Sequence, residues 1–216
     1  MFPKICGAFG RAFVVASAVA LCLVPAVVRA QDTGSYSCPV LHNAIDKVTK
    51  DTQFSDYKGV RYYYCCSACK PQFDKDQAKF LKDAKNQGKA IGMSLFDPVT
   101  DIRIESQKAT GHSDYDGVRY FFAREDGKTA FDKEPKKYTV APKNEVLFCP
   151  VSNEIVKSYV KASDYSNYKD TRYYFCCAGC KPEFDKNPDK YLDGLDRRIK
   201  AAREKAAATP EKDSKP

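Results

Sequence analysis

One fifteen-residue stretch occurs twice in this chain, and both copies carry three cysteines at the same positions. The copies are RYYYCCSACKPQFDK at 61–75 and RYYFCCAGCKPEFDK at 172–186. A fourth cysteine stands upstream, Cys38 or Cys149, so each set reads Cys, 26 residues, Cys-Cys, two residues, Cys. Aligning residues 38–81 with 149–192 without a gap gives 20 identities in 44 positions. Such an internal duplication predicts two copies of one small structural unit.

The repeated stretch predicts a strand that leads into a helix, with thiols at the junction. The aromatic run favours a strand, whereas Pro71 and Pro182 fit the first turn of a helix. We therefore expect the junction near Cys69 and Cys180. Thiols beside a helix N-terminus ionise more readily, and a thiolate can bind a metal or act as a nucleophile.

A second short helix is predicted at the end of each copy. Asp76 and Asn187, the latter followed by Pro188, have the character of an N-cap and a first helical position. Beyond Leu192, strong helix formers continue to 208 and predict a further helix. The last eight residues, 209–216, are charged and contain proline, and we expect them to be disordered.

A third, degenerate copy lies between the two. The sequence LFDPVT at 95–100 parallels LFCPVS at 147–152, and YDGVRYFF at 115–122 parallels YKGVRYYY at 57–64. The four cysteine positions are replaced in this copy by Asp97, Ala123, Arg124 and Gly127. Because the aromatic framework survives without thiols, the cysteines of the outer copies must serve function or extra stability. We expect Asp97 and Arg124 to approach each other as an ion pair.

An arginine precedes the aromatic run in all three copies, including the one without thiols. These residues are Arg61, Arg119 and Arg172. Their presence in the middle copy indicates a structural ion pair rather than catalysis. The expected partners are Asp74, Asp132 and Asp185. The repeated tyrosines are expected to pack in the sheet and to form hydroxyl hydrogen bonds.

Residues 1–30 have the pattern of a secretory signal peptide. Three basic residues and no acidic ones accompany an apolar run from Ala12 to Val28, and a small residue, Ala30, precedes polar sequence. We expect cleavage after Ala30. The alternative is an uncleaved membrane anchor, for which about 17 apolar residues is at the short limit. Localisation is then periplasmic or secreted.

Removal of residues 1–30 would leave 186 residues with a net charge of about +5, compared with +8 for the whole chain. The lysines are scattered rather than gathered with aromatic residues on one face, so we expect no nucleic-acid partner. No second apolar stretch is long enough to span a bilayer. Contact with a membrane is expected only through an uncleaved signal segment.

Eight of the ten cysteines would remain after cleavage, as two sets of four. In an oxidising compartment an even number of cysteines first suggests disulfides. A Cys-x-x-Cys at a helix start with a distant upstream cysteine is, in contrast, common in sites for soft or borderline metal ions. The sequence leaves both interpretations open.

The combined pattern resembles the YHS domain and the related TRASH-like cysteine domains. It comprises Cys/Asp-Pro-Val, then Tyr-x-Gly-x-x-Tyr-Tyr-Phe-Cys with a cysteine four residues on, then Phe-Asp-x-x-Pro. The resemblance implies an α+β fold of three tandem small treble-clef-like units, each a short β-sheet followed by a helix, and a role in heavy-metal trafficking. The expected boundaries are 1–30 signal peptide, 31–90 first unit, 91–142 degenerate unit, 143–195 third unit, and 196–216 helical end and tail.

The family pattern pairs thiols that are separated by three residues, here Cys65 with Cys69 and Cys176 with Cys180. Cys66 and Cys177 are additions to that pattern. Adjacent side chains on a strand point to opposite faces, so both members of a Cys-Cys pair can face one ion only if the strand breaks between them. Our preferred ligands are Cys38, Cys66 and Cys69, with Cys65 completing the site or facing the core. By repeat, the second set is Cys149, Cys177 and Cys180, with Cys176 in the equivalent position.

We therefore expect an exported, non-enzymatic protein with two thiolate sites for Zn or Cu(I), serving sequestration, delivery or sensing. The ligands come from all eight cysteines, and His42 is expected to be a surface residue. The partners expected are a heavy-metal ion and, as an open possibility, an exported or membrane protein. Alternatives are a disulfide-stabilised binding module without metal and, as a weaker one, a thiol-disulfide oxidoreductase. Two histidines cannot supply a repeated Cys-His catalytic pair, and no phosphate-binding glycine loop is present.

Overall fold

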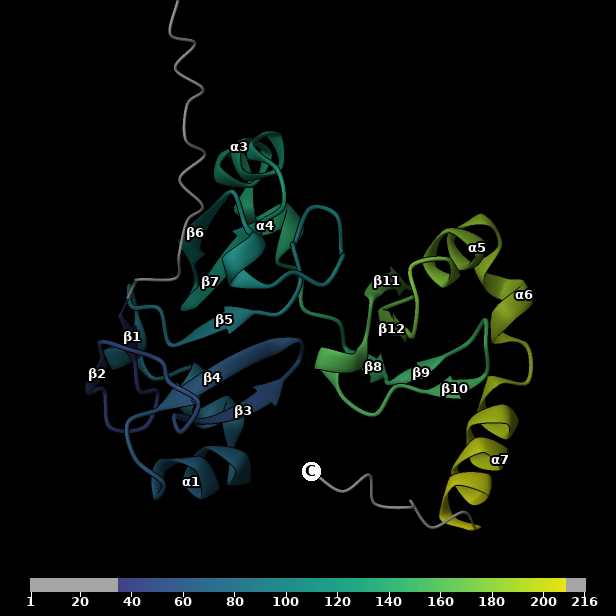
Figure 1. Cartoon of the computed structure of the whole chain (residues 1–216), viewed down its shortest axis with the longest axis horizontal. Helices are drawn as coiled ribbons and strands as arrows, with labels where there is room; N and C mark the ends of the chain where they lie inside the picture. The colour runs from purple at the N-terminus through teal and green to yellow at the C-terminus, as the bar shows by residue number, and fades with distance from the viewer. Residues whose placement is uncertain (1–34, 209–216) are drawn as a thin grey trace, which may run out of the picture.

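The computed structural model describes residues 35–208 and contains both helices and sheets, which confirms the α+β class. The expected signal peptide and the charged tail from 209 lie outside the described residues. None of the described helices is both long and apolar enough to cross a membrane. We refer to 35–90, 91–142 and 143–195 as the first, second and third segments; in Figure 1 they run from purple and blue through teal to green and yellow.

The first two segments share one five-stranded sheet. Its order is β3 (Gln53–Tyr57), β4 (Val60–Tyr64), β5 (Gly92–Ser94), β7 (Val118–Phe122) and β6 (Gly111–Tyr115). The central strand β5 runs antiparallel to β4 and parallel to β7. The sequence predicts a separate short sheet in each unit, whereas in the structure one strand, β5, joins the sheets of two segments.

The third segment has a sheet of its own in the order β11 (Asp164–Tyr168), β12 (Thr171–Phe175) and β8 (Asn144–Val146). β8 runs parallel to β12, as β5 does to β7. β5 leads directly into Leu-Phe-Asp-Pro, and β8 leads directly into Leu-Phe-Cys-Pro. The second and third segments therefore begin in the same way.

Each segment contains a tight hairpin with the same turn chemistry. Both central residues have positive φ: 51° and 73° at Lys58 and Gly59, and 47° and 78° at Asp116 and Gly117. In the third segment the angles are 48° and 62° at 169 and 170, although no glycine is present there. Two successive positive φ values match the twist of the flanking strands and fix the hairpin register.

A second small turn follows the Cys/Asp-Pro-Val sequence in each segment. It joins β1 (Tyr36–Ser37) to β2 (Ala44–Ile45) and β9 (Phe148–Cys149) to β10 (Glu154–Ile155), while a single bridge, Phe96 to Arg103, does the same in the second segment. The residue four positions after the cysteine or Asp97 has φ of 61–64° and donates its N–H to the carbonyl of that cysteine or Asp97. We call this turn the knuckle.

The helices begin where the sequence predicted. α1 (Cys69–Lys75) and α5 (Cys180–Lys186) start at the expected cysteines, and Asp76 and Asn187 cap α2 (Gln77–Leu81) and α6 (Pro188–Leu192) through side-chain acceptors. The remaining helices are α3 (Glu125–Lys133), α4 (Pro135–Tyr138) and α7 (Leu195–Ala208), with short 3-10 turns at Ala84–Asn86, Ser106–Lys108 and Tyr159–Lys161. The helix predicted beyond Leu192 is α7.

One phenylalanine from each segment's first helix anchors that helix on its strands. Phe73, Phe131 and Phe184 are at most 1% exposed. The ring of Phe131 lies 5.2 Å from that of Phe122, and the ring of Phe184 lies 5.3 Å from that of Phe175. This burial fixes the position of the helix N-terminus, and hence of Cys69 and Cys180, relative to the strand end.

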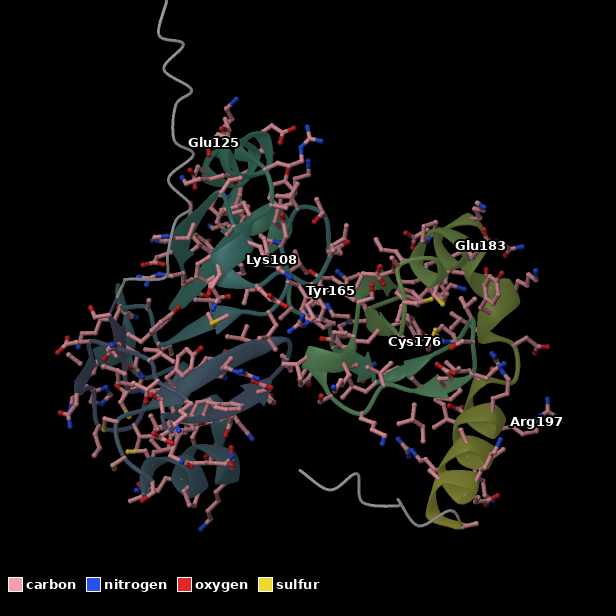
Figure 2. All side chains as sticks on the ribbon, in the orientation of Figure 1. Lys108, Glu125, Tyr165, Cys176, Glu183 and Arg197 are labelled. Atoms are coloured by element: carbon pink, nitrogen blue, oxygen red, sulfur yellow. The ribbon has the colours of Figure 1, made fainter. Side chains whose placement is uncertain are left out.

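The third segment packs against the second. The Phe96 ring lies 5.2 Å from Tyr165 and 5.6 Å from Tyr174, and Arg103 donates its backbone N–H to Ser163 at 2.8 Å. Figure 2 labels Tyr165 where the third segment meets the rest of the molecule. Buried residues of all three segments therefore form one continuous core.

The repeated arginines make structural contacts, but their predicted partners were wrong. Arg61 and Arg119 pair with Asp56 and Asp114, each at 2.8 Å, directly across the hairpin. The helix carboxylates Asp74, Asp132 and Asp185 instead accept from a strand serine and a helix lysine: Ser55 and Lys70, Ser113 and Lys128, Ser166 and Lys181. The hairpin register places the nearer carboxylate opposite Arg61 and Arg119, which the linear sequence did not reveal.

Candidate metal centres

Three cysteines of the first segment converge on one point. The Sγ atoms of Cys38, Cys65 and Cys69 all lie within 4.8 Å of one another. Cys38 immediately follows β1, Cys65 follows the last residue of β4, and Cys69 is the first residue of α1. Cys38 and Cys69 are fully buried, whereas Cys65 is partly exposed. The knuckle, the strand end and the helix start therefore each supply one sulfur.

The third segment repeats this group with Cys149, Cys176 and Cys180, whose Sγ atoms also lie within 4.8 Å of one another. Figure 2 labels Cys176 within that segment. All eight cysteines of the described chain are unbonded thiols in this structure. The sequence duplication is thus a duplication of side-chain geometry.

The structure differs from our preferred ligand set in the choice between adjacent cysteines. Cys65 joins the compact group, whereas Cys66 is exposed and touches only part of it, with its Sγ 3.4 Å from Cys69 Sγ. Cys177 repeats this at 3.2 Å from Cys180. β4 ends at Tyr64, before the pair, so strand alternation does not separate the two thiols. Both Cys65 and Cys66 consequently reach Cys69, at 3.9 and 3.4 Å.

The knuckle surrounds the first cysteine with backbone donors. Burial raises the pKa of Cys38, but backbone N–H groups of Val40, Leu41 and Cys65 hydrogen-bond its sulfur and hold the pKa below its ordinary value. The position therefore favours an anion at Cys38.

Cys149 has the same environment. Burial again raises its pKa, while the Ser152 hydroxyl and the N–H groups of Val151, Ser152 and Cys176 lower it to a net value below the ordinary one. Equivalent backbone geometry thus lowers the pKa of both cysteines.

The second segment confirms this description of the knuckle with a different anion. The Asp97 carboxylate, 1% exposed, accepts from the N–H groups of Val99 and Ala123 at 2.9 Å and of Thr100 at 3.3 Å. These donors correspond to those around Cys38 and Cys149. The predicted ion pair of Asp97 with Arg124 was wrong, because three backbone donors already satisfy the carboxylate and Arg124 pairs with Asp126 at 2.7 Å.

The other thiols of the two three-sulfur groups resist ionisation when no cation is present. Burial, followed by the neighbouring thiols, raises the pKa of Cys69 and Cys180. Burial, opposed by the Ser152 hydroxyl, raises the pKa of Cys176 to about 11. Like charges held this close destabilise one another, and a bound cation removes that penalty. Each group is therefore suited chemically to a positive ion.

Two polar neighbours of the sulfur groups were missed by the sequence analysis. Asn43 Nδ2 lies 3.7 Å from Cys65 Sγ, and Ser152 Oγ lies 3.2 Å from Cys176 Sγ. Both belong to the knuckle, and their closeness to the Cys-Pro-Val sequence was the available signal. His42 lies apart from the sulfurs, with Nδ1 2.9 Å from Asn86 Oδ1 and Nε2 3.4 Å from Asp83 Oδ2.

Comparison with known proteins bears on the third segment. A family model of the YHS domain matches residues 156–194. The match contains Cys176, Cys177 and Cys180 but begins after Cys149. No curated protein and no solved structure matches the chain. The YHS domain and the two sulfur groups are together compatible with metal binding.

Proposed function

We propose that this protein is an exported, non-enzymatic metal-binding protein that holds one soft or borderline ion, Zn(II) or Cu(I), in each of two cysteine sites. The observation that carries the proposal is the pair of three-sulfur groups, Cys38/Cys65/Cys69 and Cys149/Cys176/Cys180. Sulfur-only donor sets favour such ions over Mg(II) or Ca(II).

The sulfur spacing supports this assignment. A tetrahedral Zn site with Zn–S of about 2.3 Å places its sulfurs about 3.8 Å apart. The Cys65 and Cys69 sulfurs lie 3.9 Å apart, well beyond a disulfide bond and close to that spacing. The backbone N–H groups that lower the pKa of Cys38 favour its thiolate form, which is the form that binds the ion.

The exposed cysteines Cys66 and Cys177 suit a transfer role. Each lies at the surface and contacts a buried member of its group, Cys69 or Cys180. Hydrogen bonds from these neighbours lower the pKa of Cys66 and Cys177. An exposed cysteine next to a buried one can take an ion from a partner and pass it inward by ligand exchange. This arrangement favours a protein that sequesters the ion or exchanges it with an exported or membrane partner.

We further propose that residues 31–195 form three tandem, treble-clef-like YHS units of which the second has lost its metal. The repeated knuckle, hairpin and helix of the three segments support this reading. In the second segment Asp97 supplies the anion that a cysteine supplies elsewhere, so the unit remains folded as a scaffold.

A disulfide-stabilised module is the second candidate. The Cys66 and Cys69 sulfurs, and the Cys177 and Cys180 sulfurs, lie only 3.4 and 3.2 Å apart. Oxidation of either pair would remove a buried ligand from its sulfur group. In the exported protein, metal binding therefore predicts free thiols after denaturation and chelation, whereas the disulfide-stabilised module predicts oxidised cysteines.

Titration of the reduced mature protein with Cu(I) or Zn(II) against a chromophoric chelator tests the proposal. We expect two ions per chain, one ion for Cys38→Ser or Cys149→Ser, and two ions but slower exchange for Cys66→Ser. Asp126→Ser, at an exposed position of the cysteine-free second segment, is the control and should leave the stoichiometry at two. Loss of an ion from Cys66→Ser but not from Cys65→Ser would contradict the ligand assignment.

A further inference from the structure

A cavity of about 720 Å³ lies where the three segments meet, and its lining includes no cysteine. Its volume is within the range of sites that bind small organic molecules. The first segment contributes Tyr57 and Tyr62, the second Tyr120 and Tyr138, and the third Tyr165 and Arg172. We propose that this cavity binds a small organic molecule with one carboxylate on a flat apolar body, recognised by Arg172. This cavity is separate from the proposed metal centres.

Arg172 differs from its two repeat counterparts in a way that leaves it available to a ligand. Arg61 and Arg119 each make two hydrogen bonds to a hairpin carboxylate, Asp56 or Asp114, at 2.8 and 2.9 Å. The matching residue of the third segment is Asn167, an amide, which accepts one bond from Arg172 Nε at 2.9 Å.

Arg172 is the most buried of the charged side chains that line this cavity. It is 8% exposed and stacks over the Tyr165 ring at 4.0 Å. Within 35–208 no carboxylate lies at ion-pair distance from it. Glu145 lies opposite Arg172 on β8, and its two carboxylate oxygens accept hydrogen bonds from the hydroxyls of Tyr159 and Tyr174. The Glu145 carboxylate stabilises the charge of Arg172 from beyond ion-pair distance, and a bound carboxylate would supply the direct ion pair that Arg61 and Arg119 already have.

Two tyrosine hydroxyls extend the polar part of the cavity wall. Tyr62 and Tyr120 both line the cavity. An oxygen anion held by Arg172 could accept from such hydroxyls, since a few convergent polar groups orient a ligand in an otherwise apolar site. The rings supply flat surfaces on which a planar body can stack.

The charges of the wall restrict the ligand to a single acidic group. Lys58 and Lys82 line the cavity, and so do Asp83 and Asp116. Carboxylates in the wall repel a second or third negative charge, which disfavours polyphosphates. Arg172 provides the planar, forked donor that a carboxylate fits.

The experiment uses the mature protein and 2-naphthoate as the probe, with 2-naphthamide as its uncharged analogue and ATP as a polyanion. Binding is measured by calorimetry. We expect 2-naphthoate to bind with a submillimolar dissociation constant and the amide and ATP to bind at least about tenfold more weakly, as loss of one charged hydrogen-bonding pair predicts.

Asn167→Asp is the decisive variant, because it gives Arg172 the internal carboxylate that the other two segments already tolerate. It should weaken 2-naphthoate binding at least about tenfold and leave thermal stability intact. Asn187→Asp is the matched control. It makes the same Asn-to-Asp change at a position whose first-segment counterpart is also an aspartate, Asp76, but Asn187 lies outside the cavity lining. The inference is overturned by absence of saturable 2-naphthoate binding, by equal binding of the amide, by tighter binding of ATP, or by unchanged binding to Asn167→Asp. Each outcome leaves the metal proposal unaffected.

Discussion

Removing the Asp97 carboxylate should destabilise the protein strongly even though this residue binds no metal. The carboxylate is buried and accepts three backbone N–H groups. A hydrogen bond to a charged group contributes about 1.5–3 kcal/mol, and a donor left buried and unsatisfied costs a similar amount. Allowing for water entry at the knuckle, we expect Asp97→Ala to lower the free energy of unfolding by about 3–5 kcal/mol.

Urea unfolding at constant m-value measures this loss. Asp97→Cys tests the reasoning further, because it installs the residue found in the other two knuckles. As pH rises and the thiol ionises, Asp97→Cys should become progressively more stable than Asp97→Ala. Asp126→Ala, which removes an exposed carboxylate paired with Arg124, should leave the unfolding free energy unchanged. A loss below about 1 kcal/mol for Asp97→Ala would refute the claim that the knuckle is built around an anion.

Three further predictions concern other parts of the chain. Burial, opposed mainly by Lys181, raises the pKa of Asp164 from 3.8 to about 6, so the native state holds this proton more tightly than the unfolded chain. The contribution of Asp164 to stability should therefore fall as pH rises from about 4 to about 6, by at most about 3 kcal/mol. Thermal unfolding measured across this pH range should show that Asp164→Asn removes this contribution. Gly92→Ala places a Cβ 2.8 Å from the Arg61 carbonyl oxygen and should cost about 1–3 kcal/mol in urea unfolding, whereas Gly127→Ala, with only Val99 nearby at 3.8 Å, should stabilise α3 slightly. Ser152→Ala removes the hydroxyl beside Cys176 and should weaken metal binding about 10-fold at that site alone, with the first-segment site as internal reference in a chelator competition.

Local features of this fold could be predicted from sequence because they depend on near neighbours. The aromatic runs, the prolines after Cys69 and Cys180, and the caps at Asp76 and Asn187 each act within a few residues, and the structure confirms the strands and helix starts that they predicted. The repeat also identified the positions that now converge as two sulfur groups.

Other features depend on contacts that the sequence pattern does not encode. The sharing of one sheet by two segments rests on β5, three residues that pair on both sides. Both Cys65 and Cys66 reach Cys69 because β4 ends at Tyr64, immediately before the pair. Asp97 accepts backbone donors rather than pairing with Arg124 because the knuckle and the end of β7 bring three N–H groups together in space. Hairpin register likewise decided the arginine partners.

The most direct test of the central claim is native mass spectrometry of the mature protein isolated from its exported compartment, combined with thiol counting after denaturation and chelation without reductant. The account predicts two metal ions per chain and all eight cysteines as titratable thiols. A metal-free chain with its cysteines joined in disulfides would contradict it.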